Sequence, residues 1–125
     1  MAVARRRIDV QEGKAALKAW LEGPQPPSGT PVPRTVLATA VRYSLEELTA
    51  RAPGNSVEVR VPPFGVTQCV EGPRHTRGTP PNVIECDAAT WLEMVTGQLA
   101  WAEAVTAGRV AASGLRADLS ALLPF

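Results

Sequence analysis

Residues 56–72, SVEVRVPPFGVTQCVEG, decide the fold class because apolar residues recur in them at every second position. In the first half, valines alternate with charged residues, which is the pattern of a half-buried strand. The alternating residues are Val57, Glu58, Val59, Arg60 and Val61. A proline pair, Pro62 and Pro63, interrupts this pattern before a second alternating run begins. The stretch therefore predicts two consecutive strands.

The second of these strands has two faces of different character. One face carries Thr67 and Cys69, and the other carries Phe64, Val66, Gln68 and Val70. Alternation alone leaves open which face meets the core, and with it whether Cys69 is buried. Residues 82–86, NVIEC, predict a short third strand that ends before Asp87.

Helices are predicted on both sides of these strands. Residues 8–23 form the first, with Asp9 as the N-cap, and residues 34–54 form a second, amphipathic helix. After the third strand, the apolar spacing and glycine stops predict helices in 88–97 and 99–108, a strand in 109–114 and a final helix in 115–125. The inward residues of the final helix are expected to be Leu115, Leu119, Leu122 and Leu123.

The predicted element order is α-α-β-β-β-α-α-β-α. Strands in one run, followed by helices, indicate an α+β domain with an antiparallel or mixed sheet of four to five strands covered by helices. The length of 125 residues predicts one domain over 1–125, in which 1–33 form an N-terminal helix and a proline-rich linker.

Composition narrows the classes of function. The formal net charge of +1 gives no bulk basic field, so no nucleic-acid partner is expected. Polar residues follow the basic start of the chain, and no apolar run approaches the ~18 residues of a membrane span, so neither a signal peptide nor integral membrane association is expected. We therefore expect a cytoplasmic protein with free thiols.

The C-terminal third resembles a known family. In DAATWLEMVTGQLAWAEAVTAGRVAASGLRADLSALLPF (87–125), an acidic residue precedes a Thr-Trp-Leu helix, followed by Gly97, Gly108-Arg109-Val110 and a leucine-rich end. These features resemble sterol carrier protein 2-like domains. Together with RTVLATAVRYSLEEL (34–48) and VEVRVPPFGVTQCVEGPRHTRGTPPNV (57–83), they are similar to the compact bacterial, especially actinobacterial, branch of that family.

The resemblance implies helices and a curved sheet enclosing an apolar cavity that binds lipids or other hydrophobic molecules without catalysis. The residues expected to line such a cavity are Leu92, Val95, Val105, Leu119 and Leu122, with Trp101 at a rim. An apolar stripe of this kind is more often simply core, and that alternative stays open. Arg74 and Arg77 lie in a glycine-flanked turn suited to an acidic head group, or to a solvated loop.

Residues 68–86, QCVEGPRHTRGTPPNVIEC, hold both cysteines and the single histidine of the chain. Cys69, His75 and Cys86 lack the paired spacing of a zinc site, so no metal is expected. A reactive Cys69 near His75 is the alternative to an inert, buried thiol. A disulfide between Cys69 and Cys86 would be geometrically possible if their strands pair, although a reducing compartment argues against it.

Taken together, these observations predict a non-enzymatic protein without catalytic residues or cofactors. It is expected to bind or carry a small hydrophobic ligand such as a lipid, a fatty acid or a sterol-like molecule, with a homodimer left open. The alternative is an enzyme or accessory domain in thiol-dependent, maleylpyruvate isomerase-like chemistry that uses Cys69 or His75.

Overall fold

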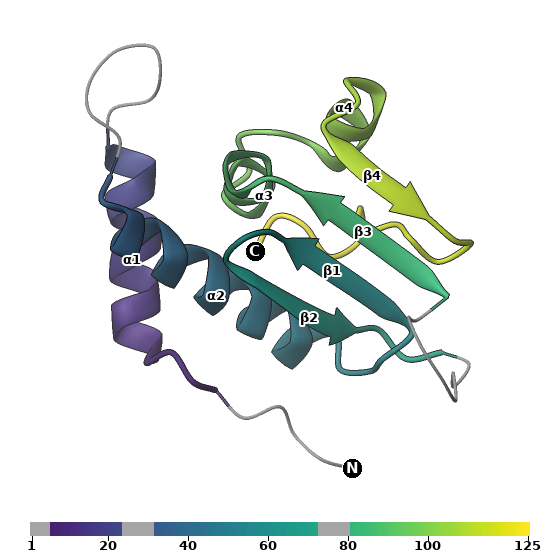
Figure 1. The fold of residues 1–125 in the computed structure, drawn as a ribbon, viewed down its shortest axis with the longest axis horizontal. Helices are drawn as coiled ribbons and strands as arrows, with labels where there is room; N and C mark the ends of the chain where they lie inside the picture. Colours follow the sequence, from purple (N-terminus) through teal and green to yellow (C-terminus); the bar gives the residue numbers. More distant parts are fainter. Residues whose placement is uncertain (1–5, 24–31, 73–80) are drawn as a thin grey trace.

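The computed structural model describes residues 6–23, 32–72 and 81–125. Its elements follow one another along the chain as shown in Figure 1. They are α1 (Val10–Glu22), α2 (Arg34–Arg51), β1 (Val57–Val61), β2 (Gly65–Cys69), β3 (Asn82–Cys86), α3 (Ala88–Val95), α4 (Trp101–Thr106) and β4 (Val110–Ser113).

The four strands form one sheet in the order β2-β1-β3-β4. β1 pairs antiparallel with β2 and parallel with β3, while β3 pairs antiparallel with β4. The parallel pair in the middle makes the sheet mixed. The predicted α+β fold is thereby confirmed in its mixed, four-stranded form.

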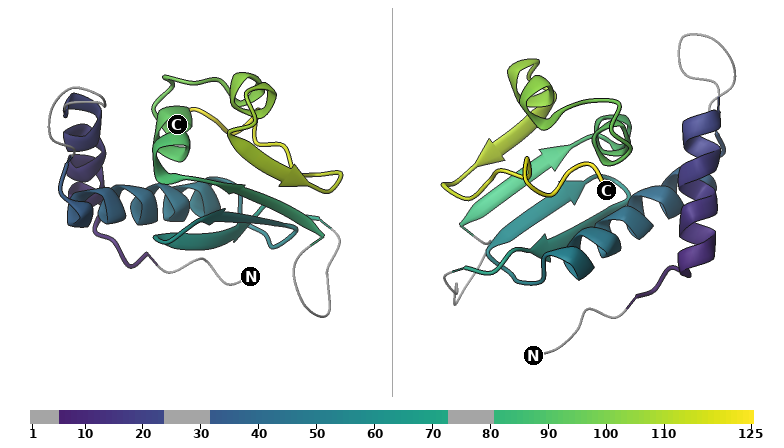
Figure 2. Two further views of the ribbon diagram at one scale, coloured as in Figure 1. Left: turned by 45° about the horizontal axis from the view of Figure 1, so that its top comes forward. Right: turned by 180° about the vertical axis from the view of Figure 1, so that it is seen from behind.

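Helices cover one face of this sheet. In Figure 1 α2, α3 and the C-terminal segment lie behind the strands, and the reverse view in Figure 2 brings them to the front. Toward them point fully buried side chains of three strands, which are Val57, Val59, Val61, Cys69 and Ile84. The opposite face carries Glu58, Arg60 and Glu85, and Val66 is 58% exposed there. The question left by alternation is thus answered: the Thr67–Cys69 face of β2 meets the core.

The predicted caps of two helices are confirmed. The Asp9 carboxylate accepts hydrogen bonds from the backbone N–H groups of Gln11 and Glu12 at the start of α1. Asp87 does the same for Thr90 at the start of α3, at 2.8 Å. Each cap provides an acceptor for backbone donors that have no partner within the helix.

α1 packs closely across α2. A Cβ atom at Gly13 would lie 2.1 Å from Cγ of Tyr43, which is itself buried. The absence of a side chain at Gly13 therefore lets the two helices approach, and it allows Trp20 further along α1 to be 94% buried.

The predicted helix over residues 115–125 is wrong. This segment, which we call the C-terminal tail, runs as turns and irregular structure after β4. Gly114 turns the chain with a φ of +106°, and Leu115 is fully exposed instead of buried. Leu119 is fully buried, and Phe125 N–H donates to the carbonyl of Val95 at 3.1 Å. Packing against α3 and the core thus outweighs the helix propensity of a leucine- and alanine-rich sequence.

Candidate functional site

The site with the most suitable geometry is a groove between α3, α4 and the C-terminal tail, which we call the α3–α4 groove. It is partly enclosed and has a volume of about 370 Å³. Its apolar wall is formed by Met94, Leu99, Trp101, Ala102, Leu123 and Pro124. Its polar rim is formed by Gln98, Glu103 and Ser120.

The groove exists because the chain turns sharply after α3. Gly97 has a φ of +83°, a left-handed conformation that glycine adopts without a steric cost, and this confirms the helix stop expected there. The backbone N–H groups of Gln98 and Leu99 both donate to the carbonyl of Glu93, which fixes the turn. α4 then starts at Trp101, and its first turn faces the space above the tail.

The opposite wall is fixed by the end of the chain. The hydrogen bond from Phe125 to Val95 anchors the tail to α3, and the Arg51 guanidinium lies 4.7 Å from the centre of the Phe125 ring. Stacking of a cation on an aromatic face is worth about 0.5–1 kcal/mol at an exposed site. Leu123 and Pro124 are consequently held in place along the groove.

Five of the residues expected to line a cavity fall into two groups. Leu92, Val95 and Leu119 are at most 2% exposed and belong to the hydrophobic core beneath the groove. Trp101 and Leu122 are partly buried against that core, and Trp101 also lines the groove. No observation tests whether these five residues contact a ligand; the groove favours such a contact for Trp101, whereas the burial of Leu92, Val95 and Leu119 favours the alternative that they are simply core.

Val105 lies apart from the other cavity candidates. Its side chain is 42% exposed on α4, whereas Ala104 beside it is fully buried and faces the core. Val105 is therefore not part of the buried core, and its contact with a ligand stays a prediction. Arg74, Arg77 and His75, by contrast, fall outside the described residues.

Several residues that line the groove were not predicted from the sequence. Leu99 and Met94 carry an apolar signal, but Leu123 and Pro124 reach the groove through the irregular tail, which was expected to be helical. Apolar periodicity identifies a buried helix face, and it contains no information on a wall made by a non-helical segment.

Other hollows are less suited to an apolar ligand. One lies on the open face of the sheet, where Glu58, Arg60 and Glu85 line it, and is wide open to solvent. Another lies between α1 and α2 and is equally open. Apolar ligands favour concave sites that remove most of their surface from water, so the partly enclosed groove is the better candidate.

Both cysteines are buried free thiols. Burial raises the pKa of Cys69 to about 11 and is the main cause that raises the pKa of Cys86 to about 12. β1 lies between β2 and β3, so these two outer strands are not paired with each other. Cys69 on β2 pairs with Val57 at the start of β1. Cys86 on β3 comes directly after Glu85, which pairs with Arg60 near the end of β1. At ~3.3 Å per residue the two thiols lie roughly 13 Å apart along the strands alone, far beyond the reach of a disulfide. The condition for the proposed bond, direct pairing of their strands, is not met.

We expect both thiols to react slowly with iodoacetamide at pH 7 in the folded protein. A pKa of about 11 leaves roughly one thiol in 10⁴ ionised at neutral pH, against a few per cent for a free cysteine. Because the thiolate is the reactive form and burial favours the protonated thiol, the rate of alkylation should still rise tenfold per pH unit well beyond pH 9. Alkylation followed by mass spectrometry measures this, with the urea-unfolded chain as control. Modification of Cys69 in the folded protein at the rate of free cysteine would instead support thiol chemistry.

Two further findings concern metals and membranes. Within 6–23, 32–72 and 81–125, no cluster of three histidine, cysteine or acidic side chains is arranged to hold a metal ion. In the same part of the chain, none of the helices combines the length and the apolar character needed to cross a bilayer.

Comparison with known proteins places the groove in a family context. The family model described as bacterial SCP ortholog matches residues 33–125, and so covers every described element from α2 to the tail while leaving α1 outside. No curated protein matches the chain.

Proposed function

The chain belongs to the family of bacterial SCP orthologs, and on that basis we propose that it is a non-enzymatic carrier of a small hydrophobic molecule bound in the α3–α4 groove. The resemblance to sterol carrier protein 2-like domains is confirmed by this membership. The observation that carries the proposal is the groove itself, because it is partly enclosed, lies within the matched residues and has an apolar wall.

The size and charge of the groove define the ligand class. Its volume of about 370 Å³ is at the lower end of the range for small-molecule sites, which suits a single alkyl chain. Glu103 at the rim disfavours an acidic head group there. We therefore propose a ligand with an alkyl chain and a neutral head group.

The expected affinity is modest. Transfer of a methylene group from water contributes about 0.8 kcal/mol, so a chain of six to eight carbons gains roughly 5–6 kcal/mol before the cost of association. A gain of this size corresponds to dissociation constants of roughly 40–200 µM, and the cost of association moves them toward the millimolar range, which is suited to a carrier that must release its cargo.

We expect Ala102→Phe to weaken binding at least tenfold. Ala102 is exposed on α4 and lines the groove, so a benzyl group there fills the space for the ligand without disturbing the core. The measurement is a titration with the neutral apolar dye N-phenyl-1-naphthylamine, followed by displacement with 1-decanol. Native mass spectrometry of the purified protein adds a direct search for bound lipid.

The matched control is Ala89→Phe. Ala89 is an exposed alanine on α3 that does not line the groove. Its replacement adds the same aromatic group to the surface and should leave dye affinity unchanged. Equal affinity of both variants and the original protein would place the ligand elsewhere.

A further inference from the structure

A second hollow lies at the edge of the sheet that β2 forms, whereas the α3–α4 groove lies among α3, α4 and the C-terminal tail. It is partly enclosed, has a volume of about 390 Å³, and is lined by residues 7–8, by α2 and by residues 64–67 at the start of β2. We call it the arginine cleft. Its charged and apolar lining includes Arg7, Ile8, Arg42, Leu45, Phe64 and Val66.

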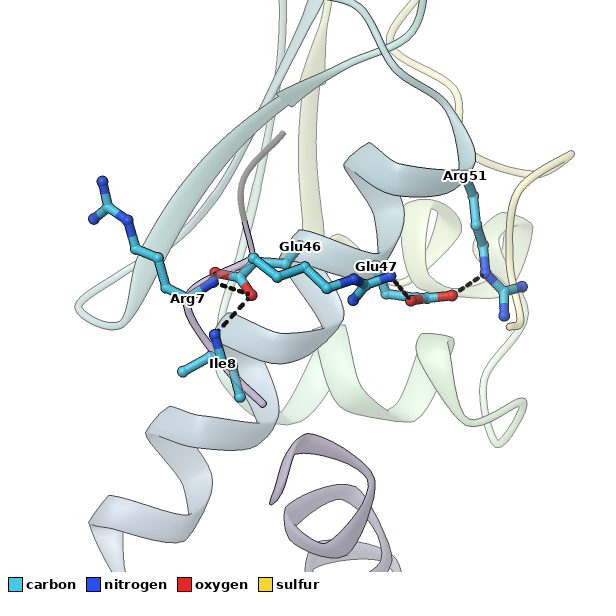
Figure 3. Close-up of polar contacts among 6 residues, drawn as sticks. Arg7, Ile8, Glu46, Glu47 and Arg51 are labelled. Carbon is cyan, nitrogen blue, oxygen red and sulfur yellow. Dashed lines mark hydrogen bonds and ion pairs between the residues drawn. The ribbon is translucent and has the colours of Figure 1, made fainter. Parts of the chain in front are cut away.

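One wall of the arginine cleft is held by a glutamate of α2. The Glu46 carboxylate accepts hydrogen bonds from the backbone N–H groups of Arg7 and Ile8, at 3.0–3.1 Å (Figure 3). The next residue, Glu47, pairs with Arg51 and Arg6 at 2.7 Å, and these partners lower the pKa of its carboxyl group. Both carboxylates are thus engaged in fixing the N-terminal segment and α2.

The arginines around the cleft differ from most others in the described chain. Elsewhere in these residues, carboxylates pair with Arg6, Arg51, Arg60 and Arg109. No such ion pair is formed within the described residues by Arg7, Arg34 or Arg42. The Arg7 side chain extends away from the glutamates in Figure 3, and Arg7 is an exposed residue that lines the cleft.

Phe64 brings the other two guanidinium groups together. Arg42 Nε donates to the carbonyl oxygen of Phe64 at 2.9 Å, while the Arg34 guanidinium lies 4.9 Å from the centre of its ring. Arg34 and Arg42 therefore both contact Phe64, and Arg7 and Arg42 bring two positive charges to the lining of the cleft itself. The negative charge of Glu46 balances only one of them.

We propose that the arginine cleft binds a phosphate or carboxylate group attached to a short apolar chain. Arginine pairs with these anions through parallel N–H donors, and the exposed Val66 with the half-buried Ile8 offers an apolar surface beside them. This site is independent of the proposed carrier function, because it shares no lining residue with the α3–α4 groove.

The test is a titration of the ¹⁵N-labelled full chain with octyl phosphate, followed by NMR. We expect shifts of the amide signals of Gly65, Val66 and Thr67, and an affinity that falls as salt is added. Arg7→Gln and Arg42→Gln should each weaken binding roughly tenfold, the loss expected for a charge-assisted contact. Arg7→Gln is the more informative change, because the described residues form no ion pair with the Arg7 side chain and its bonds to Glu46 come from the backbone N–H group.

Arg116→Gln is the matched control. Arg116 lacks a carboxylate partner among the described residues, and its guanidinium donates to the carbonyl of Glu71 at 3.4 Å, outside the cleft. The same loss of charge there should leave octyl phosphate binding unchanged. The neutral probe 1-octanol should leave the cleft signals of Gly65, Val66 and Thr67 in place.

A second arm identifies the source of the anion. The protein is sedimented with vesicles of phosphatidylcholine and phosphatidylserine. If its binding to the vesicles requires Arg7 and Arg42, the anion is assigned to a membrane lipid. If the two arginines are required for octyl phosphate binding but the protein does not bind the vesicles, the anion is assigned to a free amphiphile. Either outcome supports the cleft. The proposal is overturned if neither probe binds, if both arginine variants bind as tightly as the original protein, or if octyl phosphate shifts only Gly97, Gln98 and Leu99. Dye binding in the α3–α4 groove is measured separately, so a failure of the proposed carrier function is distinguishable from a failure of the arginine cleft to bind an anion.

Discussion

Replacement of Trp91 by alanine is expected to lower the free energy of unfolding by about 3–5 kcal/mol, the range found when a large aromatic side chain is removed from a core. Trp91 is fully buried in α3 and is among the largest such side chains in the described chain. Its Nε1–H donates to Ser44 Oγ in α2 at 2.8 Å. Removal of the indole therefore leaves a cavity and also breaks the polar link between the two helices.

Urea denaturation followed by circular dichroism measures this loss. Trp101→Ala is the control, because Trp101 is only partly buried and should cost less than about 2 kcal/mol. Ser44 keeps acceptors of its own in the Ala40 and Val41 carbonyls, so the cost should come mainly from packing. A similar loss in the two tryptophan variants would contradict the packing of α2 against α3 described above.

Gly114→Ala is expected to destabilise the protein by about 2–6 kcal/mol, the combined range for backbone strain and overpacking. Gly114 has a φ of +106°, and a Cβ atom there would lie 2.3 Å from Asn82 Oδ1 and 2.5 Å from the carbonyl oxygen of Pro81. Asn82 cannot move away freely, since it is buried and bonded through Nδ2 to Ser56 and through Oδ1 to the N–H of Arg116.

The effect should extend to ligand binding. Gly114 is the residue from which the C-terminal tail starts, and the tail supplies Leu123 and Pro124 to the groove. Gly108→Ala is the control, because its φ of +73° carries similar strain but a Cβ atom there meets nothing within 4 Å. We expect it to cost about 1 kcal/mol in a thermal or urea melt. Equal destabilisation by the two substitutions would show that the contact with Asn82 adds nothing to the cost of backbone strain at Gly114.

The strands were predictable because one face of each is buried. The alternation in 57–61 marks the core-facing valines correctly, and the caps at Asp9 and Asp87 mark where helices begin. The parallel pairing of β1 with β3 could not be read from alternation, which gives the faces of a strand and not its neighbours.

The C-terminal tail shows why part of the site escaped prediction. Residues 115–125 have the composition of a helix, yet Leu119 is buried and Phe125 is bonded to α3 without helical structure. These contacts join residues distant in sequence, so no local pattern indicates them. Trp101 was expected at a rim and lies on the groove wall, whereas Leu123 and Pro124 became recognisable as wall residues only from the fold.

The most direct measurement is of nuclear Overhauser effects between 1-decanol and the protein at saturating ligand. We expect contacts from the alkyl chain to the Trp101 indole and to the Leu123 methyl groups, with unchanged signals from the buried Leu92. Contacts to Leu92, or contacts found only on the outer face of the sheet at Val66, would contradict a carrier whose cargo lies in the α3–α4 groove.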